Sequence, residues 1–571
     1  MGGNRRGGTM LAGFSILGVA GLVCKVIGMV FRVQLSARIG AQGIGLYQAV
    51  YPTYTLLLTL STAGLPVAIS RMVAEATTTR DERGAKKILT TALGLVGTIG
   101  LALTALMLMG SGWLAERIGA SDAATGVSAK MGFQMIAPSI VIVALMSAFR
   151  GYMQGHRVML PTGISQLIEQ LAKVVISFPL AAWGMARGGV AMAAAMALLG
   201  ITIGEALALG YMAVSSMVWM RRNGGTGDDP PSAGVPVAPS AAGETPPSGD
   251  IGGEGYPSAG KASPRRHSVL FRMLTIAVPI TLGAAIVPSL GFIDSAMIIN
   301  RLISAGFSHG DAQTLYGLQS GAVLSLLNVP TALALAVAMS LVPTISAANA
   351  RGDKAEVSGQ TLLSLRLAFL IGLPCAMGMS LLSTPIIRLL YSGYTADQIA
   401  TAGRLLSIGA FTIPLFILVQ AAEGALQGVG LQRIPMWTLV IGAAVKTSLN
   451  YLLIGLPGIN IFGAPIASLA CYALVASINL AFAMKRTGAR FHLMDLIVRP
   501  GLCTLIMAAA VLACQAILGT DSSIKTLTAV GAGMLAYVIA APATGAVRRD
   551  DLSQFPGLSR LSGRFSKKKA L

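Results

Sequence analysis

Apolar stretches of about twenty residues recur along almost the whole of this 571-residue chain. A helix of that length crosses a hydrocarbon core of roughly 30 Å. Inside a bilayer each segment must satisfy its own backbone hydrogen bonds, and without a period-2 strand pattern only helices can do so. We therefore predict an all-α polytopic membrane protein with about fourteen transmembrane helices. The spans are expected near residues 10–37, 46–72, 88–113, 131–149, 163–184, 190–219, 270–297, 317–346, 359–384, 402–426, 436–456, 463–484, 498–518 and 524–543.

The placement of charge supports this fold class. Only 11% of the residues are charged, against roughly a quarter in soluble proteins. The net charge of +20 could indicate nucleic-acid binding, but about 30 of the 42 Lys and Arg residues fall in cytoplasmic segments if the N-terminus is cytoplasmic. This is the positive-inside bias of membrane proteins. We predict two cytoplasmic termini, a basic cytoplasmic tail over residues 546–571, membrane lipids as partners, and no nucleic acid.

A polar segment divides the chain. Residues 223–268 are rich in Gly, Pro and Ser, and such a segment cannot bury apolar surface. We predict a disordered cytoplasmic linker there, between an N-lobe of spans 1–6 and the remaining spans. The predicted domains are residues 1–222 for the N-lobe, 269–486 for a C-lobe of spans 7–12, and 487–545 for spans 13 and 14.

The two lobes resemble copies of one another. RGYMQGHRVMLP begins at Arg150 and EGALQGVGLQRIP begins at Glu423. Each copy has an even number of spans, so both copies have the same orientation and their repeat axis lies along the membrane normal. This organisation is typical of transporters that rock two lobes around a central cavity, and the alternative is a duplicated scaffold that transports nothing. The matching landmarks lie 273 or 274 residues apart: Gln154 and Gln427, Pro161 and Pro435, Gly189 and Gly463.

Sequence motifs for catalysis and for cofactors are missing. The sequence has no GxxxxGK[ST] phosphate loop and no HExxH zinc motif, and its five cysteines are irregularly spaced within apolar runs. We therefore expect that the protein is not an enzyme and that it uses no metal and no cofactor. The energy for transport would come from a Na⁺ or H⁺ gradient, the membrane potential or the gradient of the substrate.

Charged residues inside the predicted spans are functional candidates, because each costs at least about 2.5 kcal/mol at the centre of a membrane helix. Lys25 and Arg32 lie two turns apart on one face of the first span, about 10 Å along its axis. Two such cations favour an anion such as a pyrophosphate, although Lys25 could instead snorkel or pair with a carboxylate. Asp294 in the seventh span could pair with a cation of the first span, hold a coupling ion, or pair with Arg301 in its own lobe.

Several other charged residues complete the candidate set. Glu169 and Lys173 are four residues apart on the fifth span, a spacing that predicts an ion pair within one helix. Arg71 and Arg150 lie at cytoplasmic ends of spans, where they could gate a cavity or only set the topology. Lys446 on the eleventh span could pair with an acid of the tenth. The predicted substrate-binding residues are Lys25, Arg32, Asp294, Arg71, Arg150, Glu169 and Lys446.

Two long segments closely resemble the stage V sporulation protein B group of polysaccharide exporters. They are KVIGMVFRVQLSARIGAQGIGLYQAVYPTYTLLLTLSTAGLPVAISRMVAE, residues 25–75, and RGYMQGHRVMLPTGISQLIEQ, residues 150–170. The shorter motifs IDSAMIINRL, LVPTIS and FGAPIASLA extend the resemblance into the second half. This group belongs to the multidrug/oligosaccharidyl-lipid/polysaccharide (MOP) exporter superfamily, which includes the MurJ-type lipid II flippases.

The resemblance implies two six-helix lobes around a cationic cavity, a groove near spans 13 and 14 for a polyprenyl tail, and a sugar-pyrophosphate head group. By position, Lys25 and Arg32 resemble the basic first-span residues of the group, and Asp294 resembles the acid of its seventh span. Proteobacterial flippases of this type carry further arginines on the second and eighth spans. This sequence departs from them, because its second span is uncharged until Arg71 and its eighth has no arginine.

The predicted function is a flippase that moves an undecaprenyl-pyrophosphate-linked cell-wall precursor, with lipid II as the leading candidate, across the bacterial cytoplasmic membrane by alternating access. Its partner would be an anionic lipid-linked glycan. The alternatives are a flippase for another lipid-linked polysaccharide repeat unit, a cation-coupled multidrug antiporter, and a membrane scaffold that transports nothing. The basic first span argues against the antiporter, since such pumps favour acidic and aromatic cavities.

Overall fold

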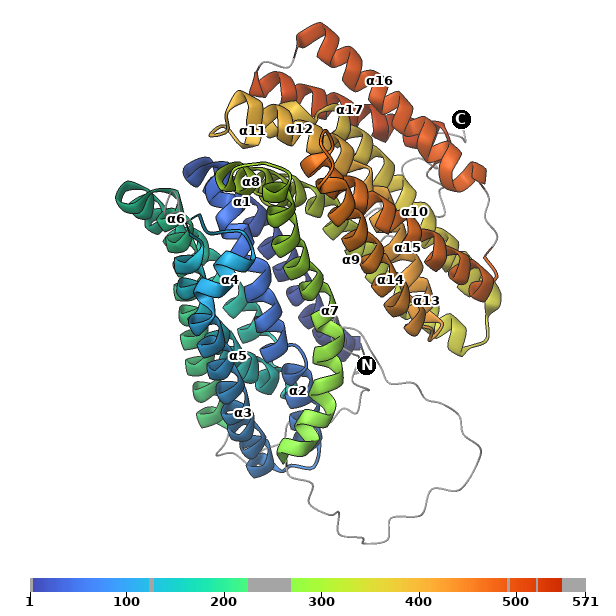
Figure 1. The fold of residues 1–571 in the computed structure, drawn as a ribbon. Helices are drawn as coiled ribbons and strands as arrows, with labels where there is room; N and C mark the ends of the chain where they lie inside the picture. The colour runs from blue at the N-terminus through green and yellow to red at the C-terminus, as the bar shows by residue number, and fades with distance from the viewer. Residues whose placement is uncertain (1–3, 123–127, 224–268, 490–492, 520–521, 547–571) are drawn as a thin grey trace. The chain divides into compact units, whose positions relative to one another are not determined.

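The computed structural model describes most of the chain, and every regular element in the described part is helical. There are seventeen α-helices and three short π or 3-10 segments, with no strand among the described residues (Figure 1). The predicted all-α fold class is confirmed. The predicted linker and tail lie outside the described residues except for Asn223 and Ala546 at their first positions. The described ranges are 4–122, 128–223, 269–489, 493–519 and 522–546, with residues 4–23, 25–26 and 332–340 described by their backbone alone.

Eleven helical segments among the described residues are long and apolar enough to cross a membrane, by length and composition. Two of the helices are too long for one crossing. The helix α1 (Asn4–Thr62) is broken at Gly40, and α6 (Leu160–Asn223) is broken at Gly188 and Gly189. A straight helix with the 64 residues of α6 would be roughly 96 Å long, about three times the hydrocarbon core. Each therefore consists of two arms, and the count of fourteen spans stays a prediction.

The helices form two compact units, which divide between Gly317 and Leu318. In the first unit α7 packs against α1 and α2, although the repeat predicted from the sequence groups the seventh span with the second lobe. The Gly64 N–H donates to Thr281 Oγ1 of α7 at 3.1 Å, and a Cβ at Gly291 of α7 would lie 3.6 Å from Pro52. Besides α1 and α6, the first unit contains α2 (Leu65–Thr78), α3 (Glu82–Met109), α4 (Ser111–Arg117), α5 (Lys130–Gly155), α7 (Val269–Ser304) and α8 (His309–Tyr316).

Part of the helix order of the first unit recurs in the second unit. A long helix of 28 residues and a short helix follow each other in both units, as α3 and α4 in the first and as α10 and α11 in the second. The last two helices, α16 and α17, pack against each other, and α16 also packs against α10. The unit contains α9 (Leu324–Ala350), α10 (Lys354–Leu381), α11 (Ser383–Leu390), α12 (Ala396–Ala410), α13 (Thr412–Gly428), α14 (Arg433–Ile454), α15 (Gly463–Thr487), α16 (Arg499–Leu518) and α17 (Ser523–Ala543).

Matching local contacts support the internal repeat. The side chain of Asp81 caps α3 by accepting the Gly84 N–H, and Asp353 caps α10 by accepting the Glu356 N–H. These caps satisfy backbone donors that a helix start leaves unpaired. The glycine that ends α5, Gly155, lies against α2, and the glycine that ends α13, Gly428, lies against α9, since a Cβ at either position would come within 2.7 Å of a neighbouring side chain.

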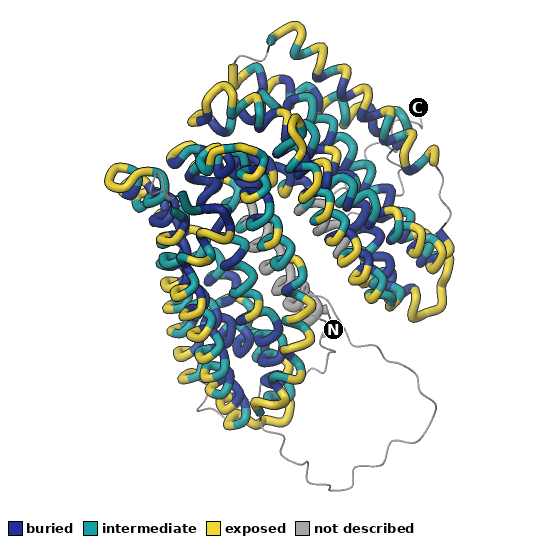
Figure 2. Tube along the Cα trace, viewed as in Figure 1, coloured by how far each residue is buried: buried dark blue, intermediate teal, exposed yellow. Residues whose placement is uncertain are grey.

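The burial pattern within each unit is that expected in a bilayer. Figure 2 shows exposed residues along the outer faces of the helices and buried residues along their inner faces. Many exposed side chains are large and apolar, such as Leu101, Val175 and Val538. Such a surface is compatible with lipid, whereas an apolar surface of this extent is rare on soluble monomers.

The break in α1 gives a prediction about stability. Gly40 has φ 70° and ψ 178°, a conformation almost restricted to glycine. No atom lies within 4 Å of a Cβ built there, so the cost of a side chain is backbone strain alone. Replacing Gly40 with Ala is expected to lower the free energy of unfolding by about 1–3 kcal/mol, measured by thermal unfolding in detergent.

Gly94 in α3 provides the matched control for Gly40. A Cβ built at Gly94 also meets no atom within 4 Å, but its backbone is helical. Replacing Gly94 with Ala is expected to leave stability unchanged or to raise it by up to ~1 kcal/mol. Equal losses of stability in the two variants would contradict the assignment of strain to Gly40.

Candidate functional site

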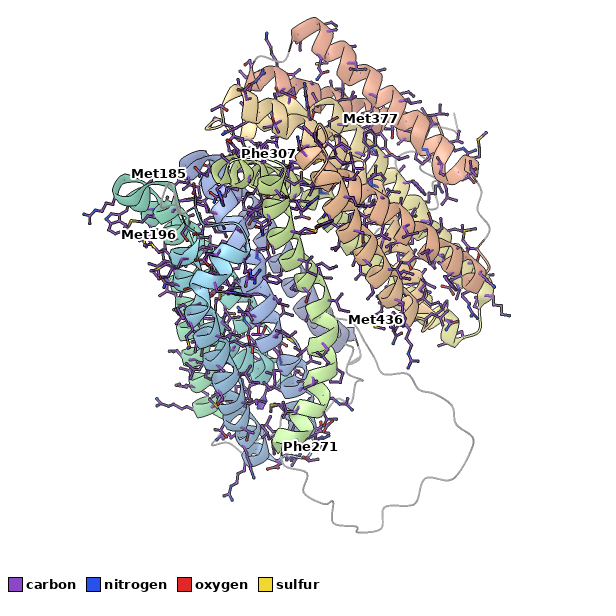
Figure 3. All side chains as sticks on the ribbon, viewed as in Figure 1. Met185, Met196, Phe271, Phe307, Met377 and Met436 are labelled. Carbon is purple, nitrogen blue, oxygen red and sulfur yellow. The ribbon has the colours of Figure 1, made fainter. Side chains whose placement is uncertain are left out.

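Buried polar and aromatic side chains gather inside the first unit, between α1, α5 and both arms of α6. Figure 3 labels Met185 and Met196, which lie on the two arms of α6 on either side of its break. We call this group the polar cluster. It places cations, acids and hydroxyl groups inside membrane-spanning helices, where each of them requires partners. Its members are Arg32, Tyr47, Tyr51, Tyr54, Ser139, Arg150, Glu169, Lys173 and Glu205.

A row of three tyrosines on the second arm of α1 forms one side of the cluster. Tyr47, Tyr51 and Tyr54 are spaced at i, i+4 and i+7, which places them on one helix face. Neighbouring ring centroids are 5.7 Å and 5.8 Å apart. The guanidinium carbon of Arg32, from the first arm, lies 5.9 Å from the centroid of the Tyr51 ring. This is a cation–π contact, and it is possible because α1 turns back at Gly40.

The row of tyrosines ends at a buried acid. The Tyr54 hydroxyl donates to Glu205 Oε1 at 2.9 Å and lies 3.0 Å from Ser139 Oγ of α5. Glu205 is only 4% exposed. Its other oxygen, Oε2, is buried and makes no hydrogen bond within the described part of the chain. The hydroxyl groups of Tyr54 and Ser139 therefore form a hydrogen-bonded chain that ends at Oε1 of Glu205, whereas Oε2 is not part of such a chain.

Close contact between the arms of α6 brings Glu205 beside Glu169 and Lys173. A Cβ at Gly204 would lie 3.0 Å from the backbone nitrogen of Lys173, and a Cβ at Gly200 would lie 2.5 Å from Ser177 Cα. Glycines four residues apart let two membrane helices approach at the backbone. Any side chain at these two positions would push the arms apart and would move Glu205 away from the first arm.

An ion pair joins α5 to the first arm of α6. Arg150 Nη2 lies 3.2 Å from Glu169 Oε2, and Arg150 Nε donates to Ser165 Oγ at 3.1 Å. The prediction that Glu169 pairs with Lys173 on its own helix is wrong. Arg150 reaches Glu169 from the neighbouring helix, and Lys173 Nζ instead lies 4.7 Å from the centroid of the Phe31 ring. Lys173 still lies within electrostatic range of Arg32, Glu169 and Glu205.

The other predicted site residues lie in different environments. Asp294 is half-buried on α7 of the first unit. Lys446 is half-buried on α14 of the second unit and so is not a member of the polar cluster. The side chain of Lys25 lies outside the described residues. Of the predicted set, the structure thus brings Arg32, Arg150 and Glu169 together.

Arg71 belongs to a separate, exposed ion-pair network. Its Nε lies 3.4 Å from Oε1 of Glu75 on the same helix, and its side chain is 58% exposed. Glu75 also pairs with Arg272 at the start of α7, beside Phe271 of Figure 3. This network joins the ends of α2 and α7.

The aromatic members of the cluster were not predicted. The sequence LYQAVYPTY carries the signal, because its three tyrosines repeat with the period of a helix. Tyrosines in a membrane span are ordinarily read as interfacial anchors. Only the packing of α5 and α6 over Tyr54 shows that its hydroxyl contacts an acid.

His156 lies one residue past the end of α5, outside the spans. Its ring centroid is 4.5 Å from that of Tyr152 and 4.4 Å from that of Trp219. Neither ring nitrogen makes a hydrogen bond among the residues that the structure describes. Burial without a charged partner lowers the pKa of His156 from 6.5 to about 4.

This burial predicts how stability depends on pH. Because the pKa of His156 is lower in the folded state, the full stabilisation is present above about pH 6.5 and is lost as the pH falls toward about 4. We expect a loss on the order of 1 kcal/mol over that window, after allowing for partial exposure of the ring. Thermal unfolding across this pH range would measure it. Replacing His156 with Phe should flatten that part of the profile, and an unchanged profile would contradict the prediction.

The cluster as a whole has excess positive charge. It contains three basic side chains and two acidic ones, all inside membrane-spanning helices. Such a group can attract an anion, exchange a proton, or do both. No group of three or more His, Cys, Asp or Glu side chains in the described ranges could hold a metal ion.

Comparison with protein families gives two matches. A family model described as polysaccharide biosynthesis protein matches residues 10–349. A model described as lipid II flippase MurJ matches residues 280–539. Together they cover almost the entire membrane-spanning part of the chain.

Individual proteins give the same picture. The chain is 26% identical over 546 residues to lipid II flippase MurJ of Bacillus subtilis, covering 94% of each chain. It is 26% identical over 482 residues to stage V sporulation protein B of the same organism, covering 84% of each. These matches confirm the resemblance seen in the sequence motifs. The relatives are named as a flippase, a sporulation protein and a probable multidrug resistance protein, which agrees with the expectation that this chain is not an enzyme.

Solved structures confirm the architecture. A lipid II flippase MurJ in an inward closed conformation superposes with a TM-score of 0.63 at 16% identity, covering 92% of this chain and 97% of that one. An inward-facing multidrug transporter of the MOP superfamily gives a TM-score of 0.60 at 14% identity, covering 81% of this chain and 94% of the other. At these identities the likeness extends to the fold alone.

Proposed function

Since this chain belongs to the polysaccharide biosynthesis protein family, whose model matches residues 10–349, we propose that it is a flippase for a lipid-linked precursor of an anionic glycan. The observation that carries the proposal is the excess of positive charge in the polar cluster. Three basic side chains lie within the membrane spans of this chain. Charged side chains are costly there and therefore rare, and they ordinarily mark the path of a substrate or an ion.

The physical problem in flipping such a lipid is the charge of its head group. A pyrophosphate inside a hydrocarbon core loses its water, and a desolvated ion costs many kcal/mol unless opposite charge replaces the water. Arg32 and Lys173 provide that charge from two helices, α1 and α6. The Arg150–Glu169 pair beside them fixes the first arm of α6 against α5.

The substrate that we propose is an undecaprenyl-pyrophosphate-linked cell-wall precursor, with lipid II first. The support comes from the relatives, because a protein named lipid II flippase aligns with 94% of this chain. The sequence contains two repeats, and the even number of predicted spans in each gives them the same orientation in the membrane. This organisation supports alternating access as the mechanism. We place the protein in the bacterial cytoplasmic membrane, with both termini in the cytoplasm, because of the positive-inside distribution of its basic residues.

One other substrate class has specific support. The family model that matches residues 10–349 is described as polysaccharide biosynthesis protein, and stage V sporulation protein B, which is not named as a lipid II flippase, matches 84% of the chain at the same identity as the lipid II flippase. A flippase for a different lipid-linked polysaccharide repeat unit is therefore the second candidate. A multidrug antiporter has weaker support, since the likeness to multidrug transporters extends to the fold at 14% identity and the cluster is basic.

The direct test is a flipping assay with the purified protein in proteoliposomes. Fluorescent lipid II is placed in both leaflets, and a membrane-impermeant quencher reports how much of it reaches the outer surface. We expect protein-dependent exchange of lipid II, and slower exchange of a neutral polyprenyl glycan of the same tail length. Exchange no faster than in protein-free vesicles would refute the proposed function, and faster exchange of another anionic glycan would favour the second candidate.

A further inference from the structure

The carboxyl group of Glu205 is held in an asymmetric way that the proposed function does not explain. Tyr54 of α1 donates to its Oε1, and Ser139 of α5 lies behind Tyr54. Its Oε2 is buried and has no hydrogen-bond partner among the described residues. An ionised carboxylate has about four acceptor sites, and leaving half of them empty in a buried position is costly.

The charges around Glu205 do not supply it with a counterion of its own. Arg150, the arginine of α5, is already paired with Glu169 at 3.2 Å. Lys173 lies over the Phe31 ring at 4.7 Å. No ion pair to Glu205 occurs within 4 Å in the described part of the chain. The charged and titratable groups that face Glu205 are Tyr47, Tyr51 and Tyr54 from α1, Arg150 from α5, and Glu169 and Lys173 from the first arm of α6.

We propose that Glu205, hydrogen-bonded through Tyr54 to Ser139, is a proton-binding site whose occupancy controls how strongly the neighbouring cations hold an anion. In the protonated state the acid is neutral, and the proton resides on the oxygen that Tyr54 does not contact. When the acid ionises, the O–H bond of Glu205 breaks, its electron pair stays on the carboxylate, and the proton passes to water. This inference deepens the proposed function and depends on it only for the identity of the anion.

The coupling follows from the charge of the cluster. With Glu205 neutral, three basic side chains and the carboxylate of Glu169 leave two excess positive charges. Loss of the proton from Glu205 reduces the excess to one and provides a new partner for Lys173. Proton binding therefore strengthens anion binding, and by linkage anion binding strengthens proton binding.

The geometry gives a route by which this coupling reaches the anion. Lys173 lies over the Phe31 ring of α1 and interacts electrostatically with Glu205 on the second arm of α6. The glycines Gly200 and Gly204 hold that arm close to the first arm. An ionised Glu205 draws Lys173 away from the Phe31 ring. Phe31 is adjacent in sequence to Arg32, and Lys173 interacts electrostatically with Arg32. A movement of Lys173 therefore changes the electrostatic potential at Arg32, the cationic end of the tyrosine row.

Infrared difference spectroscopy of the purified full-length protein tests the proton site without any substrate. A pH change should produce a carboxylic-acid C=O band in the wild type that is absent from Glu205→Gln. The exposed acid Glu116 provides the matched control, and Glu116→Gln should retain the band. Tyr54→Phe should keep the band and shift it upward in frequency, because the hydrogen bond to Oε1 is lost. A pH-dependent band that is the same in the wild type and in Glu205→Gln would overturn the proposal.

Binding of lipid II as the probe tests the coupling. We expect the affinity of the wild type to be about tenfold higher at a pH where the infrared band shows Glu205 protonated than at a pH where it shows Glu205 ionised, as one added charge at roughly 10 Å would give in a medium of intermediate dielectric constant. Glu205→Gln, which is permanently neutral, should bind tightly at both pH values. Equal pH dependence in the two proteins would refute the coupling. Absence of lipid II binding alongside a band assigned to Glu205 would reject the proposed substrate and retain the proton site.

Discussion

Replacing Arg32 with Ala is expected to abolish rescue of a flippase-depleted bacterial strain while the protein is still made and inserted. Arg32 extends from α1 over the Tyr51 ring, at the cationic end of the polar cluster. Loss of a desolvated contact between a cation and a pyrophosphate costs about 2–5 kcal/mol, which is at least a thirtyfold loss of binding. Growth of the depleted strain and the amount of protein in the membrane are the two measurements.

Two further variants show whether the effect belongs to the site. Arg32→Lys keeps the charge but loses the planar guanidinium that stacks on Tyr51, so partial rescue is expected. Arg404 on α12 is an exposed arginine of the second unit, and Arg404→Ala should rescue fully. Full rescue by Arg32→Ala would show that Arg32 has no role in handling the substrate.

The membrane spans could be predicted from the sequence because one physical constraint decides them. A run of apolar residues in a bilayer must be helical, whatever its neighbours do. The breaks are also visible in the sequence, since Gly40 and the Gly188–Gly189 pair fall between predicted spans. Gly40 and Gly189 have positive φ angles, which other residues avoid. The parallel repeat was predicted from landmarks such as Gln154 and Gln427, and the matching caps at Asp81 and Asp353 support it.

The contacts between helices could not be predicted in the same way. The spacing of Glu169 and Lys173 is local information, and it favours a pair within α6. The structure pairs Glu169 with Arg150 because α5 packs on the first arm of α6, a tertiary contact that no spacing within one helix reveals. The sequence repeat likewise assigns α7 to the second copy. Its packing against α1 and α2, which the repeat does not reveal, places it in the first compact unit.

The Arg150–Glu169 pair gives the second large effect. Replacing Glu169 with Ala should lower the free energy of unfolding by about 3 kcal/mol, because Arg150 is then left in a membrane-spanning helix without its counterion. The two side chains are 17% and 24% exposed, which places the effect at the lower end of the range for buried pairs. Thermal or denaturant unfolding in detergent would measure it.

The exposed pair of Arg71 and Glu75 provides the contrast, since Arg71→Ala should cost at most about 1 kcal/mol. A double-mutant cycle on Arg150 and Glu169 separates pairing from other effects of truncation. The variant that lacks both side chains should be more stable than the sum of the single losses implies, because no charge is left unpaired. Additive losses would mean that the two residues stabilise the unit independently, and that the 3.2 Å contact between Arg150 and Glu169 contributes little.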